Sequence, residues 1–173
     1  MKRAILFLSI VFFFVTSSFA QKVIGIGGEL SMLGLKPNVR MWISKTTGFE
    51  AFGGIASELN DFKPDDLEAG FKFLQTVIYT RSNRTYFGLV GKWKWLNILS
   101  TSDKTNLPVP GLLIGKEWFE KRARLKGLAI ELGYQYGSKE YQIYNANHIR
   151  TGSYQYGEFP LIINLRYSLY KKR

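Results

Sequence analysis

The chain contains a single histidine, His148, which lies near Ser153 and Glu158 in the sequence. A serine nucleophile, a histidine base and an acidic side chain are the groups with which many hydrolases cleave esters. The same three residues also fit a polar loop exposed to solvent, and we favour that interpretation. We therefore predict no catalytic residues, with a hydrolase as the alternative.

Metal and cofactor sites are not indicated by the sequence. There is no cysteine and only one histidine, so the usual transition-metal ligands are missing. The acids between Glu58 and Asp66 lie close together but lack the spacing of a calcium-binding loop. The glycines of 25–28 alternate with apolar residues in a strand pattern, which a phosphate-binding loop does not show. We predict no metal and no cofactor.

Charged side chains recur at every second position of stretches that are otherwise apolar. In Gly127–Gly137, Leu128, Ile130 and Leu132 share one face, and Glu131 shares the other with glycine and alanine. A face of glycines and ionisable groups is typical of the interior of a narrow membrane barrel. Because a buried unpaired charge is costly, such residues should pair inside the barrel. A gate or a proton path is the alternative role. The predicted interior charge network comprises Glu29, Arg40, Glu50, Glu68, Lys72, Lys92, Lys94, Glu131 and Arg166.

Eight segments show this alternation, with an average length near the ten residues that cross an outer membrane when a strand is tilted. They are Val23–Leu35, Val39–Ser44, Phe49–Ala56, Leu67–Tyr79, Tyr86–Trp95, Val109–Phe119, Gly127–Gly137 and Glu158–Tyr170. Which face of Val109–Phe119 points into the barrel stays open, because Lys116 and Glu117 fall on opposite faces.

The connections between these segments alternate in length. After a first turn at Gly34–Asn38, short returns alternate with long polar loops, which are Ser57–Asp66, Asn97–Pro108 and a third ending near Gly157. With an even number of strands, both termini and all short returns lie on the periplasmic side. The sequence therefore predicts an all-β fold, an eight-stranded antiparallel up-and-down transmembrane β-barrel.

The first twenty residues predict export. Two basic residues precede an apolar run from Ala4 to Val15, and small residues follow up to Ala20. This order is typical of a signal peptide that is cleaved after the small residues, although an uncleaved anchor helix is the alternative. No later stretch is long and apolar enough for a spanning helix. We predict a signal peptide at residues 1–20 and one barrel domain at residues 21–173.

The chain is basic, with a formal net charge of +11 that falls to 11 − 2 = +9 without Lys2 and Arg3. An exported chain without a nucleic-acid-binding motif is not expected to bind nucleic acid. Outer-membrane lipids with anionic headgroups are the expected partner. A solvated basic edge that aids assembly is the alternative. The predicted periplasmic rim carries Lys45, Arg81, Arg84, Lys121, Arg122, Arg124, Lys171, Lys172 and Arg173.

Aromatic residues in the predicted strands are candidates for the two girdles that anchor a membrane protein at the lipid headgroups. These residues are Trp93, Trp95, Trp118, Tyr134, Tyr136, Phe159 and Tyr167.

The export signal, the eight alternating segments, the glycine and aromatic texture of Gly127–Gly137 and the amphipathic last segment together resemble a known family. The chain is similar to the small eight-stranded outer-membrane barrels, the group that includes OmpX, OmpW and the barrel domain of OmpA. It departs from that group at its end, where Tyr170 is followed by three basic residues. Such barrels usually end on an aromatic residue.

Three functions are compatible with these features. The first is a monomeric, non-enzymatic outer-membrane barrel that stabilises the envelope or presents long external loops to a ligand or protein. The second is an enzyme that modifies lipid A or phospholipid in the outer membrane. The third is a soluble periplasmic barrel that binds an apolar ligand, as lipocalins do, and in that case the large apolar side chains would point inward.

Overall fold

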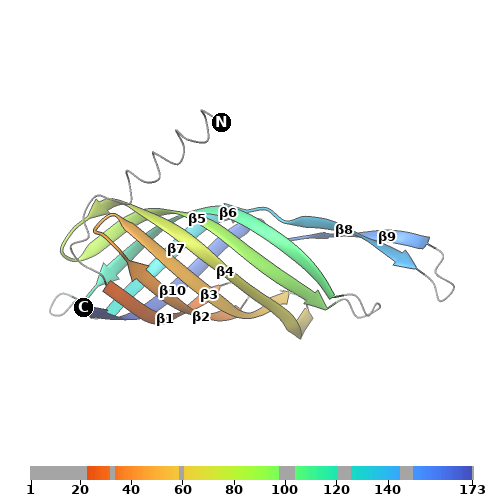
Figure 1. Cartoon of the computed structure of the whole chain (residues 1–173), viewed down its shortest axis with the longest axis horizontal. Helices are drawn as coiled ribbons and strands as arrows, with labels where there is room; N and C mark the ends of the chain where they lie inside the picture. Colours follow the sequence, from red (N-terminus) through yellow and green to blue (C-terminus); the bar gives the residue numbers. More distant parts are fainter. Residues whose placement is uncertain are drawn as a thin grey trace, which may run out of the picture.

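The computed structural model of the chain describes residues 23–31, 34–58, 61–97, 104–120, 126–144 and 150–172. These residues contain ten strands, labelled in chain order in Figure 1. They are β1 (Val23–Ser31), β2 (Gly34–Trp42), β3 (Thr47–Glu58), β4 (Asp61–Tyr79), β5 (Asn83–Asn97), β6 (Lys104–Phe119), β7 (Lys126–Gln135), β8 (Ser138–Tyr144), β9 (Arg150–Gly157) and β10 (Leu161–Lys172). The predicted signal peptide and His148 lie outside the described residues. Within the described ranges, no helix has the length and apolar character needed to cross a membrane.

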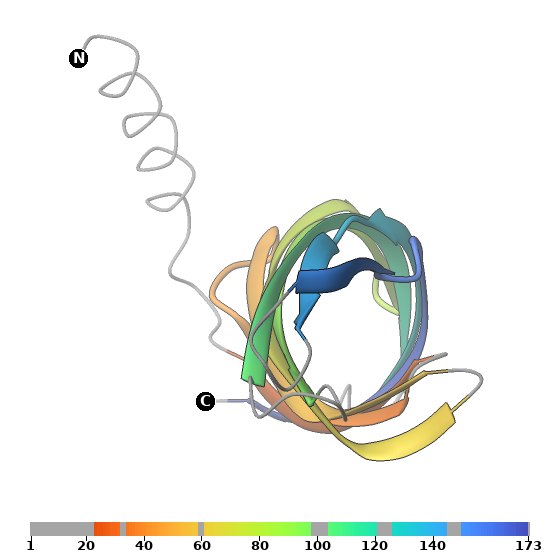
Figure 2. The ribbon, with the colours of Figure 1, turned by 90° about the vertical axis from the view of Figure 1, so that its right-hand side faces the viewer.

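Eight of these strands form a closed antiparallel barrel in the order β1-β10-β7-β6-β5-β4-β3-β2. The first and last strands close the ring, with pairs from Val23–Lys172 to Ser31–Asn164. Figure 2 shows this ring almost end-on. The predicted all-β, eight-stranded, antiparallel up-and-down barrel is therefore confirmed. Strands β8 and β9 form a separate two-stranded sheet.

The barrel strands are inclined to the long axis of the barrel (Figure 1). Following the paired residues once round the barrel from Val23 on β1, through Trp42 on β2 and Gly48 on β3, leads to Ile162 on β10. The register between β10 and β1 places Ile162 opposite a position about ten residues beyond Val23, where the path began. A displacement of this kind requires tilted strands, and eight such strands enclose a space that side chains can fill. The interior is therefore a packed core.

Side chains alternate between the interior and the outer surface of the barrel. On β7, Glu131 is fully buried, whereas Leu128, Ile130 and Leu132 are 44–50% exposed. The acidic side chain thus points inward and the apolar ones outward, as the alternation predicts. This arrangement is the reverse of a soluble sandwich, where the apolar face is covered.

The burial pattern of β6 shows which of its two faces points into the barrel. Leu113 and Glu117 are buried in the interior, whereas Leu112 and Lys116 lie on the outer surface. The Lys116 ammonium lies 5.5 Å from the centre of the Trp118 ring, which faces outward as well. A lysine can lie on an apolar surface in this way because its methylene stem packs against the surface while its charged end reaches a polar group or ring.

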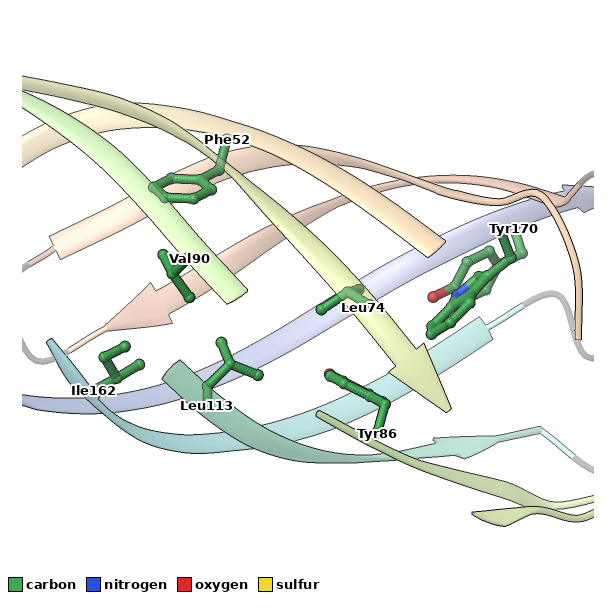
Figure 3. Close-up of a cluster of buried hydrophobic side chains, with 8 residues drawn as sticks. Phe52, Leu74, Tyr86, Val90, Leu113, Ile162 and Tyr170 are labelled. Carbon is green, nitrogen blue, oxygen red and sulfur yellow. The ribbon is translucent and has the colours of Figure 1, made fainter. Parts of the chain in front are cut away.

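Large rings in the interior lie over glycines of a neighbouring strand. An added Cβ atom at Gly48 would lie 2.5 Å from the Trp42 ring, and one at Gly115 would lie 2.5 Å from the Tyr86 ring. A ring over a glycine shields the backbone there and fills the missing side-chain volume. Figure 3 shows Tyr86 and Tyr170 among the other buried apolar side chains of the interior. The inward glycines therefore make room for these rings.

The predicted turn at Gly34–Asn38 is wrong, because these residues form the first half of β2. The chain reverses earlier, between Ser31 and Gly34, which are paired across the turn. Gly34 has a φ of 142°, a conformation that glycine adopts most easily. Pro37 fits into β2 because the pairing of β2 with β3 begins only at the next residue, Asn38.

The predicted bounds of the long loops are also wrong. Strand β3 extends to Glu58 and β4 begins at Asp61. Likewise, β5 extends to Asn97 and β6 begins at Lys104. Each pair continues into the segment expected to be loop. The third long connection contains the hairpin β8–β9, which projects beyond the end of the barrel (Figure 1).

Candidate functional site

The structure buries all nine residues of the interior charge network, none of which is more than 4% exposed. They come from seven of the eight barrel strands, and Glu117 on β6 completes the set. Charges that are far apart in the sequence therefore meet inside the ring. Their contacts fall into a central group, a group toward the chain termini and a group toward the loops.

The central group is built around Lys72, whose ammonium lies among three carboxylates. Its Nζ atom is 2.6 Å from Glu131 Oε2 and 2.9 Å from Glu50 Oε1, and it also pairs with Glu29. One oxygen from each of the three glutamates lies within 4.8 Å of the others. Negative charges this close repel strongly in a dry interior. The Lys72 ammonium supplies the positive charge that holds them together.

Arg40 connects the central group to a buried tyrosine. Its guanidinium pairs with Glu50 and Glu131, and its Nη1 atom donates a hydrogen bond of 2.9 Å to the Tyr86 hydroxyl oxygen. That hydroxyl donates in turn to Glu131 Oε1 over 2.6 Å. Each acceptor of this chain is therefore also tied to a cation. A buried network of this kind favours a single arrangement of the strands that carry it.

A second group lies toward the chain termini. Arg166 pairs with Glu117, and the Tyr170 hydroxyl donates to the same carboxylate. Arg166 Nη1 also donates to Ser168 and, over 3.4 Å, to Tyr170. These contacts tie β6 to β10, although β7 lies between the two strands in the barrel.

The third group lies toward the loops. Lys92 Nζ is 2.8 Å from Glu158 Oε1, and Lys94 Nζ is 2.6 Å from Glu158 Oε2. Gln135 Nε2 donates to the same carboxylate over 3.2 Å. Glu68 pairs with Lys36 and, at 3.4 Å, with Lys92. Because Glu158 follows β9 directly, its contacts fasten the base of the β8–β9 hairpin to the barrel interior.

Sequence reasoning missed four buried charges. Lys36 lies where the sequence predicts a turn, Glu158 is the first residue of the last predicted segment, and Glu117 lies in the segment whose inward face the sequence leaves open. Following the alternation a few residues further would have placed Lys36, since Leu35 is exposed and Lys36 buried. The fourth, Arg84, is a correction to the predicted rim. It is only 6% exposed, and its Cζ atom lies 3.6 Å from the centre of the Trp42 ring inside the barrel.

The rest of the predicted rim is placed in part. Lys45, Arg81 and Lys171 are exposed at the end of the barrel where the chain termini lie. Lys121, Arg122, Arg124 and Arg173 lie outside the described residues, as does the side chain of Lys172. Lys116 and Lys126 are additional exposed lysines on the outer surface near that end.

The seven aromatic candidates are distributed over both ends of the outer surface. Six are 39–64% exposed, and Phe159 is partly buried. Trp118 and Tyr167 lie toward the chain termini, where both pair in register with Leu128. The other five lie in the half of the barrel toward the loops, and they are Trp93, Trp95, Tyr134, Tyr136 and Phe159.

Of the three residues that the sequence suggests for a hydrolase, the structure describes Ser153 and Glu158, and His148 lies outside the described residues. Ser153 is exposed on β9, whereas Glu158 is buried and held by Lys92 and Lys94. A carboxylate used in this way is not free to orient a histidine, which is the role of the acid in a catalytic triad.

The interior groups border a small cavity. A cavity of about 30 Å³ lies beside Glu29, Lys36, Lys72 and Lys92. This volume holds only a few water molecules. The interior network can therefore bind strands to one another and bridge them through water.

The fold and its interior define a class, the eight-stranded antiparallel up-and-down closed β-barrel with an ion-paired core. Comparisons of the chain with protein-family models, with curated proteins and with solved structures found no match.

Proposed function

We propose that the chain is an integral outer-membrane β-barrel without enzymatic activity. In this proposal the residues from 21 onward cross the membrane with the eight barrel strands, after removal of a signal peptide at residues 1–20. The interior charge network gives the barrel its stability, and the β8–β9 hairpin and the loops at that end face the outside of the cell. The barrel acts as a monomer and contacts outer-membrane lipids.

The distribution of apolar side chains carries this proposal. Among the described residues, 29 large hydrophobic side chains are exposed, whereas 11 hydrophobic residues are buried. The exposed set lies on all eight barrel strands. Monomeric soluble proteins rarely expose apolar patches larger than a few hundred Å², and larger ones mark contact with a partner or a membrane. An apolar surface that continues round a closed barrel fits lipid on every side.

Strand closure supports the same proposal. Backbone N–H and C=O groups that meet lipid without a partner cost several kcal/mol each, so a sheet can cross a membrane only as a closed barrel. Here β1 pairs with both β2 and β10, and no edge remains among the eight barrel strands. The exposed aromatic residues at both ends, such as Trp93 and Tyr167, fit the two headgroup regions.

The alternatives have less support. A lipocalin-like carrier needs an apolar cavity inside the barrel, whereas the described interior is occupied by ion pairs around Lys72 and Glu158. A lipid-modifying enzyme remains the second candidate because His148 is close to Ser153 in the sequence. Incubating the purified protein with labelled lipopolysaccharide and phospholipid, with His148→Ala as control, separates the enzyme from the structural barrel.

A matched pair of substitutions tests the membrane proposal directly. Ile130 lies in the middle of β7 and is 44% exposed, and Ser153 is exposed on β9 beyond the barrel. Arginine on a lipid-facing strand costs about 2–4 kcal/mol at the bilayer midplane. The same change on a surface in water costs within about 0.5 kcal/mol. We therefore expect Ile130→Arg to lower the unfolding free energy in lipid bilayers by about 2–4 kcal/mol, and Ser153→Arg to leave it unchanged.

The measurement is a urea unfolding titration in bilayers. The folded fraction is read from gel migration, because closed membrane barrels migrate differently before and after boiling. Equal unfolding curves for Ile130→Arg, Ser153→Arg and the unmodified protein, or recovery of the protein in the soluble fraction without detergent, would contradict the membrane proposal.

A further inference from the structure

Arg84 is the one buried cation that forms no ion pair among the described residues. Each of the other buried lysines and arginines, namely Lys36, Arg40, Lys72, Lys92, Lys94 and Arg166, has a glutamate within ion-pair distance. Arg84 lies instead against aromatic rings, with its Cζ atom 3.6 Å from the centre of the Trp42 ring and 5.5 Å from that of Phe119. Its Cζ atom also lies 5.0 Å from the centre of the Tyr79 ring.

Unsatisfied donors gather at the same place. Arg84 Nε and Nη1, Trp42 Nε1 and Thr76 Oγ1 are buried and have no hydrogen-bond partner in the part of the chain that the structure describes. Thr76 pairs in register with Tyr86, whose ring packs edge-on against Trp42 at 5.9 Å. The three side chains thus belong to one corner of the interior, at the end of the barrel where the chain termini lie. Buried polar groups almost always have a partner, so this group requires an explanation.

The charge of the described interior is also unbalanced. Its buried acids are Glu29, Glu50, Glu68, Glu117, Glu131 and Glu158, and its buried bases are the six paired cations together with Arg84. One positive charge is therefore left over in the described interior, and Arg84, on which the charge of Glu117 acts from beyond ion-pair distance, is the buried cation without a paired acid. Burying a charge without a counter-charge costs several kcal/mol, and stacking on aromatic rings offsets only part of that cost.

We propose that Arg84, Trp42 and Thr76 form a binding site for a small anion at the terminal end of the barrel interior. The anion accepts hydrogen bonds from the guanidinium, the indole N–H and the hydroxyl, and it neutralises the surplus charge. The chemistry fits chloride or a phosphate group. A phosphate group comes either from inorganic phosphate or from a phospholipid headgroup that reaches the mouth of the barrel. Exposed Lys45 and Arg81 on the same end attract anions toward the mouth.

Fluorescence of Trp42 reads this site directly, because the indole takes part in it. The chain has four tryptophans, and the other three, Trp93, Trp95 and Trp118, face outward and are replaced by phenylalanine. The full chain is folded in detergent and titrated with sodium iodide, at constant ionic strength with sodium gluconate. Iodide bound at Arg84 quenches Trp42 and saturates. Chloride or inorganic phosphate then reverses the quenching by competition.

Arg84→Gln and Arg81→Gln are the matched variants, since Arg81 is exposed three residues away. We expect Arg84→Gln to raise the iodide midpoint at least tenfold and Arg81→Gln to leave it within twofold. Should Arg84→Gln fail to fold, Arg84→Lys keeps the charge with different donors, and the midpoint shifts while saturation remains. Linear quenching that is equal in all variants means that no free anion binds at these donors. This result overturns the proposal if the bilayer experiment described next also shows no protection of Trp42 by lipid.

A bilayer experiment separates the two sources of phosphate. The protein is placed in nanodiscs of phosphatidylcholine with or without phosphatidylglycerol, and the iodide titration is repeated. A midpoint in both kinds of nanodisc equal to that in detergent indicates a free anion, whereas protection of Trp42 in nanodiscs relative to detergent indicates a lipid headgroup. No saturation in detergent and no protection by lipid together overturn the site. The detergent experiment does not depend on the membrane assignment, so the site and the proposed function can fail separately.

Discussion

Replacing Lys72 by methionine removes the cation that holds three glutamates together while keeping most of the side-chain volume. The Lys72 ammonium is 2.6 Å from Glu131 and 2.9 Å from Glu50, and it also pairs with Glu29. Removing one partner of a buried ion pair costs about 3–5 kcal/mol, because the remaining charge stays buried. We expect Lys72→Met to lower the unfolding free energy by about that amount.

The same variant is expected to become sensitive to calcium. Without the ammonium, the oxygens of Glu29, Glu50 and Glu131, which lie within 4.8 Å of one another, form a group of carboxylates that suits a hard divalent cation. Calcium at a hundred times its dissociation constant stabilises a folded protein by about 2.7 kcal/mol. Calcium should therefore restore much of the stability lost by Lys72→Met and should not affect the unmodified protein.

Urea titrations of the refolded protein, in calcium chloride or in a calcium chelator, measure both effects. Lys116→Met is the control, because it makes the same chemical change on the outer surface. Lys72→Met with Glu131→Gln removes one negative charge as well and should recover part of the loss. A cost below about 1 kcal/mol for Lys72→Met, or equal calcium effects on all proteins, would refute the role given to Lys72.

Two further predictions follow from the packing of the interior and of the hairpin. Gly115→Ala places a Cβ atom 2.5 Å from the Tyr86 ring and should lower the unfolding free energy by about 1–3 kcal/mol in urea titrations. Gly152→Ala, where nothing lies within 4 Å, should change it by less than about 0.5 kcal/mol, and equal effects would contradict the packing argument. Glu158→Gln weakens the contacts with Lys92 and Lys94, so hydrogen exchange should accelerate in β8 and β9 and stay unchanged in β7. Unchanged exchange in the hairpin would show that Glu158 does not anchor it.

The sequence predicts the barrel and much of its interior because two independent patterns agree. Alternation along each strand separates Glu131 from Ile130, and the order of short and long connections sets the antiparallel path. Where one pattern was weak, the prediction failed. Pro37 and Asn38 have strong turn propensity, but burial of Lys36 and Asn38 keeps this segment in β2. Tertiary packing thus overrides local preference.

The hairpin β8–β9 and the position of Arg84 could not be predicted for different reasons. In residues 138–157 Tyr141 and Ile143 alternate with polar residues, as do Tyr154 and Tyr156, but each run is too short to distinguish a strand from a polar loop. Arg84 follows a short turn, where exposed basic residues are common. Its burial depends on Trp42 from β2, a contact that exists only once the barrel has closed. Contacts across a closed interior join residues that no local pattern relates.

The pairing of β1 with β10 has a consequence for how the molecule is made. The partners Val23 and Lys172 stand at opposite ends of the described chain, so the ring cannot close until β10 has been synthesised. Bringing such distant segments together is slow, because the entropy of the intervening chain is lost before the contact is gained. A nascent chain that lacks β10 would carry two unpaired strand edges, on β1 and β7, and protection from aggregation would then have to come from a chaperone.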